Sequence, residues 1–159
     1  MFKRMLVPID GSHGSATVVP YASALAQRLG CHVDLVLVEP TSNARLPHPD
    51  HHRPGPRVER GETGALAIAS TTSELVRRAN ERYVARHVEE FEALGVEASG
   101  QVVCGETVDE ILRAALELRS DVIAMATRKM SNYAKKDTGS ISEEVLWRSK
   151  LPVLLIASR

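Results

Sequence analysis

The C-terminal stretch that begins at Asp121 carries groups that could hold an anion. A short apolar run is followed by a basic loop, Gly139 and the start of a helix. Ser140 and Glu143 have the spacing of a capping box, in which a hydroxyl and a carboxylate each satisfy a free backbone donor. Backbone N–H groups at a helix start, with positive side chains beside them, suit a phosphate or another anion. The basic residues of the loop are Arg128, Lys129, Lys135 and Lys136.

The elements that position this stretch are predicted from apolar runs and their boundaries. Residues 122–125 and 153–156 are apolar and indicate strands that are buried on both faces. A helix over residues 140–150 separates them, because Pro152 cannot continue it. The other predicted strands are residues 5–9, 33–38 and 98–103, the last of which contains Gly100.

The remaining helices are predicted from capping signals and apolar stripes. An early helix contains Pro20 close to its start, where proline should kink the helix or delay it. Thr71 with Glu74 fits a capping box, so a long helix is expected to begin there. Thr107 with Glu110 fits the same pattern for the next helix. The stripe of the long helix consists of Leu75, Ala79, Tyr83, His87 and Phe91, and a lone histidine on such a stripe is expected to be a satisfied core or boundary residue.

The alternation of strands and helices predicts one α/β domain over residues 1–159. Such a chain forms a parallel, doubly wound sheet with helices on both faces. These sheets bind ligands beyond the carboxyl ends of their strands, where the strand order reverses. The residues expected at that edge are Asp10, Val38, Gly105 and Thr127.

Residues 41–70 are rich in proline and lack a clear helix or strand pattern. A segment of this length in a compact domain is usually a lid or a flexible loop. His48, His51 and His52 lie within it, but no cysteine or carboxylate frame completes a set of metal ligands. We therefore predict an insertion or flexible loop at about 41–70, and no metal site.

Composition narrows the classes of function. Lys plus Arg and Asp plus Glu number 20 each, so the formal charge is zero and gives no reason to expect nucleic acid as a partner. The apolar runs are shorter than the ~18 residues that a membrane-spanning helix requires, so no membrane partner is expected. Cys31 and Cys104 lack metal-type spacing, and we expect both to be reduced thiols of a cytoplasmic protein.

Several segments, in this order and spacing, resemble the universal stress protein family. They are VPIDGS, LVLVEP, GETVDEIL, SDVIAMATR and GSISEEVLWRSKLPVLLI. The resemblance covers nearly the whole chain except residues 41–70, and it implies a five-stranded parallel sheet in the order 3-2-1-4-5. It also implies a homodimer through the last strand, where an unpaired apolar edge would be an aggregation hazard. The residues of that strand are Val153, Leu154, Leu155 and Ile156.

Many members of this family bind ATP through a motif of Gly, two residues, Gly, nine residues, Gly and then Ser or Thr. In this chain the motif falls on Ala126, Lys129, Gly139 and Ser140, so half of it is missing. Glycine lets the backbone approach phosphate closely, whereas Lys129 could direct its ammonium at the phosphates or extend into solvent with the rest of the loop. By resemblance, the nucleotide-binding residues are Pro8, Ile9, Asp10, Val38, Ala126, Thr127, Arg128, Lys129, Gly139, Ser140, Ile141 and Ser142.

The resemblance implies a dimeric, cytoplasmic stress-response module that regulates or binds, with ATP or AMP as the candidate nucleotide. The sequence assigns no catalytic residue and leaves enzyme activity open. One alternative is slow hydrolysis of nucleotide on the same scaffold with magnesium, for which Asp10 is the nominated carboxylate. The other alternative is a dimer that binds only proteins because Lys129 fills the pocket.

Overall fold

The protein is described by a computed structural model that covers residues 2–41, 64–128 and 141–158. These residues form a five-stranded sheet in the order β3-β2-β1-β4-β5. Every pair of neighbouring strands is parallel, which confirms the predicted fold and strand order. The strands are β1 (Arg4–Ile9), β2 (His32–Pro40), β3 (Ala98–Gly105), β4 (Val122–Arg128) and β5 (Val153–Ser158).

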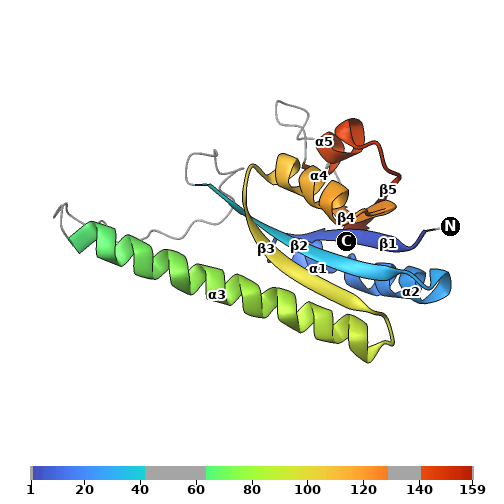
Figure 1. Cartoon of the computed structure of the whole chain (residues 1–159), viewed down its shortest axis with the longest axis horizontal. Coiled ribbons are helices and arrows are strands. Elements are labelled where there is room, and N and C mark those ends of the chain that lie inside the picture. Colours follow the sequence, from blue (N-terminus) through green and yellow to red (C-terminus); the bar gives the residue numbers. More distant parts are fainter. Residues whose placement is uncertain (1, 42–63, 129–140, 159) are drawn as a thin grey trace.

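Helices cover both faces of this sheet (Figure 1). On one face, α1, α2 and α3 pack over a core that includes Met5, Val33 and Phe91. On the other face, α4 and α5 pack over a core that includes Leu6, Ile111 and Val145. The helices are α1 (His13–Ala16), α2 (Val19–Leu29), α3 (Gly64–Ala93), α4 (Thr107–Glu117) and α5 (Ile141–Arg148).

The central strand β1 is apolar on both sides because both of its faces are covered. Leu6 and Val7 are adjacent in β1, and both are fully buried although they face opposite cores. This is the pattern of a strand inside a parallel sheet. Pro20 lies in the first turn of α2, and the chain forms α1 and α2 as separate helices before and after Val18, as its position predicted.

Two predicted helix starts are wrong. The helix α3 begins at Gly64 rather than at Thr71, so part of the segment predicted as a loop is helical. The N-cap of α4 is Glu106, whose side chain makes no capping hydrogen bond, and Thr107 is already the first helical residue. In both cases the Ser/Thr-x-x-Glu spacing recurs inside a helix, where it no longer marks a start.

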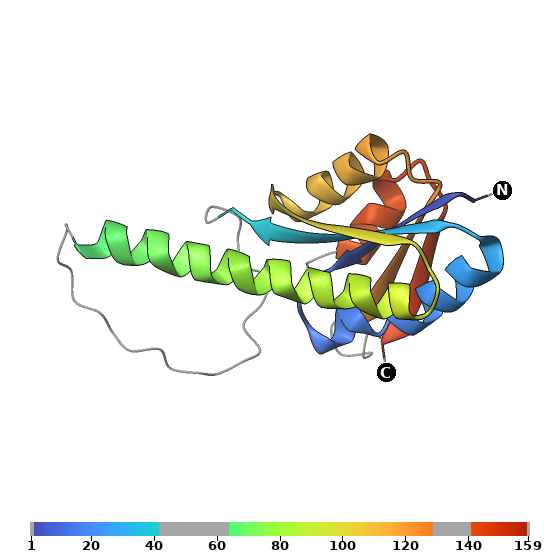
Figure 2. The same cartoon turned by 60° about the horizontal axis from the view of Figure 1, so that its bottom comes forward.

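The helix α3 is longer than the sheet that it covers (Figures 1 and 2). Its C-terminal half is anchored by Val84, His87 and Phe91, all of which are buried. Its N-terminal half extends past the sheet, and Leu75 is 59% exposed there. The predicted stripe is therefore exposed at Leu75 and Ala79, partly buried at Tyr83, and buried at His87 and Phe91.

Candidate functional site

The carboxyl ends of β1 and β4 define the candidate site, because the strand order reverses between these two strands. The chain continues from β1 to β2 on one side, whereas β4 pairs with the other side of β1 and continues to β5. In open parallel sheets, the crevice outside such a switch point is where ligands bind.

The turn after β1 lies at this switch point. The Asp10 carboxylate accepts a hydrogen bond of 2.8 Å from the Ser12 backbone N–H, and the Asp10 N–H donates to the Ser15 hydroxyl at 3.2 Å. The Ser12 hydroxyl accepts from the Ser15 N–H at 3.1 Å and so caps α1. Gly11 has a φ of +78°, a conformation that costs glycine little. Asp10 therefore acts as a turn residue, and its exposed carboxylate is held in one orientation.

The end of β4 and the first turn of α5 meet at the same edge of the sheet. The Ser142 hydroxyl donates to the Thr127 hydroxyl at 3.0 Å. Ser142 is only 5% exposed, and Thr127 is partly buried. This contact sets the start of α5 against the carboxyl end of the strand. Glu143 and Glu144 lie in the same first turn, where carboxylates interact favourably with the helix dipole.

Apolar residues predicted for the site lie behind these polar groups. Pro8 and Ile9 are the last residues of β1, and both are buried. Val38 and Ile141 are partly buried against the core under α4 and α5, whereas Ala126 packs against the core on the opposite face. The structure thus places all of these residues at the carboxyl ends of β1, β2 and β4 or at the start of α5.

The basic part of the predicted site lies outside the described residues. This applies to Lys129, Gly139 and Ser140 of the phosphate motif, and to Lys135 and Lys136. The backbone of Arg128 ends β4. The capping box at Ser140 and the three histidines of residues 42–63 also fall outside the described ranges.

Comparison with known proteins identifies the family. The model of the universal stress protein family matches residues 1–157. The chain belongs to the universal stress protein family. It is 22% identical over 156 residues to the universal stress protein MJ0531 of Methanocaldococcus jannaschii, covering 98% of this chain and 82% of that protein.

Solved structures show the same fold at low sequence identity. The hypothetical protein MJ0577, whose biochemical function was assigned from its structure, has a TM-score of 0.75 and 20% identity, with 100% of this chain and 98% of that chain covered. A universal stress protein in complex with cAMP has a TM-score of 0.64 and 18% identity, with 99% and 98% covered. The motifs that carried the resemblance therefore identified the family correctly.

Tyr83 lies near the site, although the sequence had predicted no role for it there. Tyr83 of α3 lies beside the turn after β1, and its phenolic oxygen is buried without a hydrogen bond of normal geometry in the described part of the chain. Burial raises the pKa of Tyr83, and the Ser15 hydroxyl beside it partly opposes this shift. Tyr83 also contacts the ring of His87 edge to face, with the ring centroids 4.6 Å apart. His87 shares a hydrogen bond of 2.8 Å with Glu90, so it is a satisfied core histidine, as predicted.

Two surface hollows of the described residues lie away from the switch point. One, of about 360 Å³, lies between α3 and β3, and the other, of about 610 Å³, lies on α2 around Tyr21. Neither is lined by a residue predicted to bind nucleotide. Within the described ranges, His, Cys, Asp and Glu residues form no group of three that could hold a metal ion. The described helices include none that is long and apolar enough to cross a membrane.

Proposed function

We propose that this universal stress protein is a cytoplasmic regulatory module that binds an adenine nucleotide in the crevice between β1 and β4. The hydrogen bond from Ser142 to Thr127 carries the proposal, because it sets the first turn of α5 against the carboxyl end of β4. A nucleotide phosphate there would meet backbone N–H groups at a helix start. Asp10, held in its turn on the other side of the crevice, would accept hydrogen bonds from the ribose.

Two further observations support this proposal. A structure similar to this chain was solved in complex with cAMP, a nucleotide of the same class. Cys31 and Cys104 are free thiols, which agrees with a reducing compartment such as the cytoplasm.

Nucleotide binding can be tested by the thermal shift of the purified protein with ATP, AMP or cAMP, each with and without magnesium. A ligand at about 100 times its Kd stabilises the folded state by about 2.7 kcal/mol. For a domain of this size this raises Tm by roughly 5–10 °C. Ser142→Ala and Asp10→Asn should each reduce the nucleotide-induced shift, because the first removes the hydroxyl that holds α5 against β4 and the second replaces a charged hydrogen-bond acceptor by a neutral amide.

Ser73→Ala serves as the matched control, because Ser73 is an exposed serine of α3 and is not among the residues predicted to bind nucleotide. It should keep the full nucleotide-induced shift. The absence of a shift at millimolar nucleotide in the wild type would refute the proposal. A shift that Ser142→Ala and Asp10→Asn leave unchanged would place the nucleotide elsewhere.

We also propose that the protein is a homodimer through β5, one edge of the sheet. Leu154 on this strand is 37% exposed, and Trp147 of the preceding helix is 86% exposed. Apolar side chains next to a free strand edge favour pairing with a second copy. Light scattering should show a dimer that Leu154→Glu dissociates and that Leu116→Glu, at another exposed leucine, leaves intact. A wild-type monomer at all concentrations would refute this part of the proposal.

A further inference from the structure

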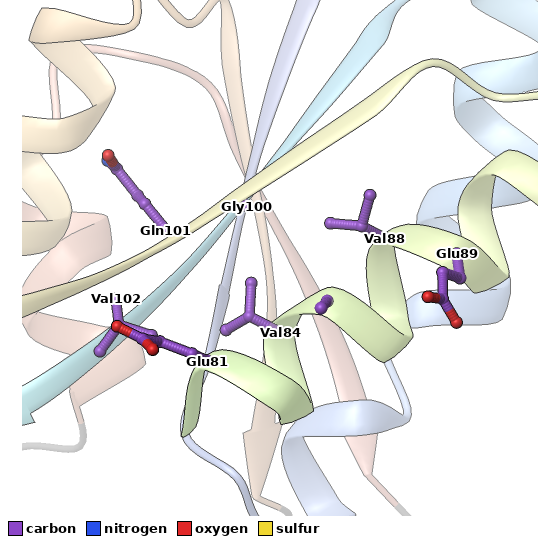
Figure 3. A pocket seen from close by; sticks show the side chains of 8 residues that line it. Glu81, Val84, Val88, Glu89, Gly100, Gln101 and Val102 are labelled. Carbon is purple, nitrogen blue, oxygen red and sulfur yellow. The ribbon is translucent and has the colours of Figure 1, made fainter. Parts of the chain in front are cut away.

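A groove separates α3 from the edge strand β3, on the opposite side of the sheet from β5 (Figure 3). Its volume is about 360 Å³. Its floor is apolar, and two glutamates of α3 lie at its rim. The residues that line it are Glu81, Val84, Ala85, Val88, Glu89, Gly100, Gln101 and Val102.

The backbone of β3 offers hydrogen-bonding groups along this groove. The Val33 N–H donates to the Glu97 carbonyl at 2.9 Å, so the backbone carbonyl of Glu97 points toward β2. Because successive residues of a strand alternate in direction, the backbone groups of Gly100 and Val102 point to the outer edge. In the described part of the chain, no strand pairs with that edge.

Gly100 brings this edge close to the helix. An ideal Cβ at Gly100 would lie 2.3 Å from Cγ1 of Val84 and 3.0 Å from Cγ2 of Val88, so only glycine allows α3 to pack against the strand here. Gly100 and Gln101 are nevertheless exposed on their outer side. The groove therefore combines an apolar floor with a strand edge that can be reached from solvent.

The rim of the groove is acidic. Glu89 forms no ion pair with another described residue, whereas Glu81 pairs with the exposed Arg77 at 3.1 Å. None of the lining residues is a cation. A second copy of the chain docked edge to edge would bring the same acidic rims together, which disfavours self-pairing. A partner with basic side chains is complementary.

We propose that this groove binds an extended basic peptide of another protein, which adds to the sheet as a strand beside β3. The peptide backbone would pair with the outward groups of Gly100 and Val102, the mode known as strand addition. A small apolar side chain would rest on Ala85 and the valines of the floor. Basic side chains on either side of it would lie beside Glu81 and Glu89.

The spacing of the two glutamates defines the peptide pattern. Glu81 and Glu89 are eight residues apart on α3, which corresponds to about 12 Å along a helix. In an extended chain, residues i and i+4 are about 13 Å apart and face the same side. The groove therefore fits Lys-x-Val-x-Lys, in which the three named side chains all face α3.

The probe is the acetylated and amidated peptide Thr-Lys-Thr-Val-Thr-Lys-Thr, titrated by calorimetry at low salt. We expect saturable binding that Ala85→Arg weakens at least tenfold, because Ala85 is exposed and a long cation there fills the groove. Glu89→Gln should weaken binding about 1.5- to 5-fold, and less at high salt. Ala79→Arg, at an exposed position of the same helix outside the groove, should leave affinity unchanged.

Two modified peptides test strand addition itself. N-methylation of every second residue removes the donors on one edge of the peptide, so one of the two alternating patterns should abolish binding and the other should largely preserve it. A peptide with glutamate in place of lysine should not bind. Equal affinity of both methylated peptides and the parent would overturn the proposal, as would no binding at about 1 mM peptide.

A second copy of the chain is the competing occupant. Light scattering without peptide tests this alternative. A dimer that Ala85→Arg dissociates and Ala79→Arg leaves intact would overturn the peptide assignment. Circular dichroism and thermal melting establish that each variant is folded before it is titrated. None of the lining residues belongs to the proposed nucleotide site, so the two proposals stand or fall separately.

Discussion

Replacing Gly100 by alanine tests the packing of α3 against β3. The added methyl group would lie 2.3 Å from Cγ1 of Val84, well inside the roughly 3.5–4.0 Å of a normal carbon–carbon contact. Val84 cannot move away at low cost, because it is β-branched and only 3% exposed. Strand and helix must therefore separate, or Val84 must leave its rotamer.

The expected loss of stability follows from two opposing terms. Inserting a methyl group into a packed core costs about 1–3 kcal/mol. Replacing glycine by alanine where φ is not positive recovers about 0.4–1 kcal/mol by restricting the unfolded chain, and Gly100 has no positive φ. The net destabilisation should be about 1–2 kcal/mol, which urea denaturation resolves from the midpoint at constant slope.

A double-mutant cycle identifies the cause. Val84→Ala removes the atom that the new methyl group would meet, so it should cost less in the Gly100→Ala background than in the wild type, by at least about 0.5 kcal/mol. Gly95→Ala is the matched control: Gly95 has a φ of +76° and nothing within 4 Å of an ideal Cβ, so its cost is backbone strain that Val84→Ala cannot relieve. Additivity of Gly100→Ala and Val84→Ala within about 0.3 kcal/mol would refute the close contact.

Three further predictions concern other parts of the fold. The backbone N–H groups of Lys3 and Arg4 donate to the Asp121 carboxylate and lower its pKa below the ordinary 3.8. The stability that Asp121 contributes is therefore complete above pH 3.8 and is lost as the pH falls through the lowered pKa. Asp121→Asn should be less stable than the wild type at neutral pH but equally stable in strong acid, as measured by urea denaturation at a series of pH values. Arg4→Met should cost about 1.5–3 kcal/mol, because it removes the guanidinium that pairs at 2.7 Å with the buried carboxylate of Asp34, which keeps the Ser99 hydroxyl at 2.8 Å and His32 at 3.3 Å. Adding Asp34→Asn should restore part of that stability in the same denaturation assay. Cys104 is exposed, whereas Cys31 is buried and its burial raises the pKa of its thiol. A thiol reagent should therefore label Cys104 alone in the native protein and both thiols in urea. Rapid labelling of Cys31 under native conditions would contradict the structure.

The sheet could be predicted from the sequence because four of its five strands, all except β3, contain an apolar run bounded by charged or turn residues. Runs buried on both faces, separated by helices, allow little else than a parallel sheet. Helix starts were less predictable. Thr107 has the right spacing for an N-cap, but the N-cap is Glu106, which has an extended conformation with φ −73° and ψ 124°. The helix therefore begins one residue earlier than the capping box predicted. Spacing alone does not distinguish a cap from the first turn.

The polar residues of the candidate site could be predicted because they follow the apolar runs that mark the strands. Asp10 and Thr127 follow apolar runs, and the ends of parallel strands share one edge of the sheet. The hydroxyl contact between Ser142 and Thr127 could not be predicted, because it depends on where α5 lies relative to β4. Tyr83 was placed on a buried stripe, yet its position beside the turn after β1 depends on how the long helix crosses the sheet.

The length of α3 explains both why the stripe was overestimated and why one helix borders two different surfaces. Its 30 residues extend about 45 Å, whereas the eight residues of β3 extend about 26 Å. The sheet can therefore bury little more than half of the helix, and an apolar stripe beyond that point has nothing to pack against.

Where helix and sheet do overlap, α3 has two different neighbours. On one side, the Asn80 amide donates to the Glu39 carboxylate, at the carboxyl end of β2, at 2.9 Å. Residue 81 is turned about 100° from residue 80, which directs Glu81 to the groove beside β3. A single helix thus contacts the carboxyl end of β2 on one face and forms the wall of the proposed peptide groove on the next.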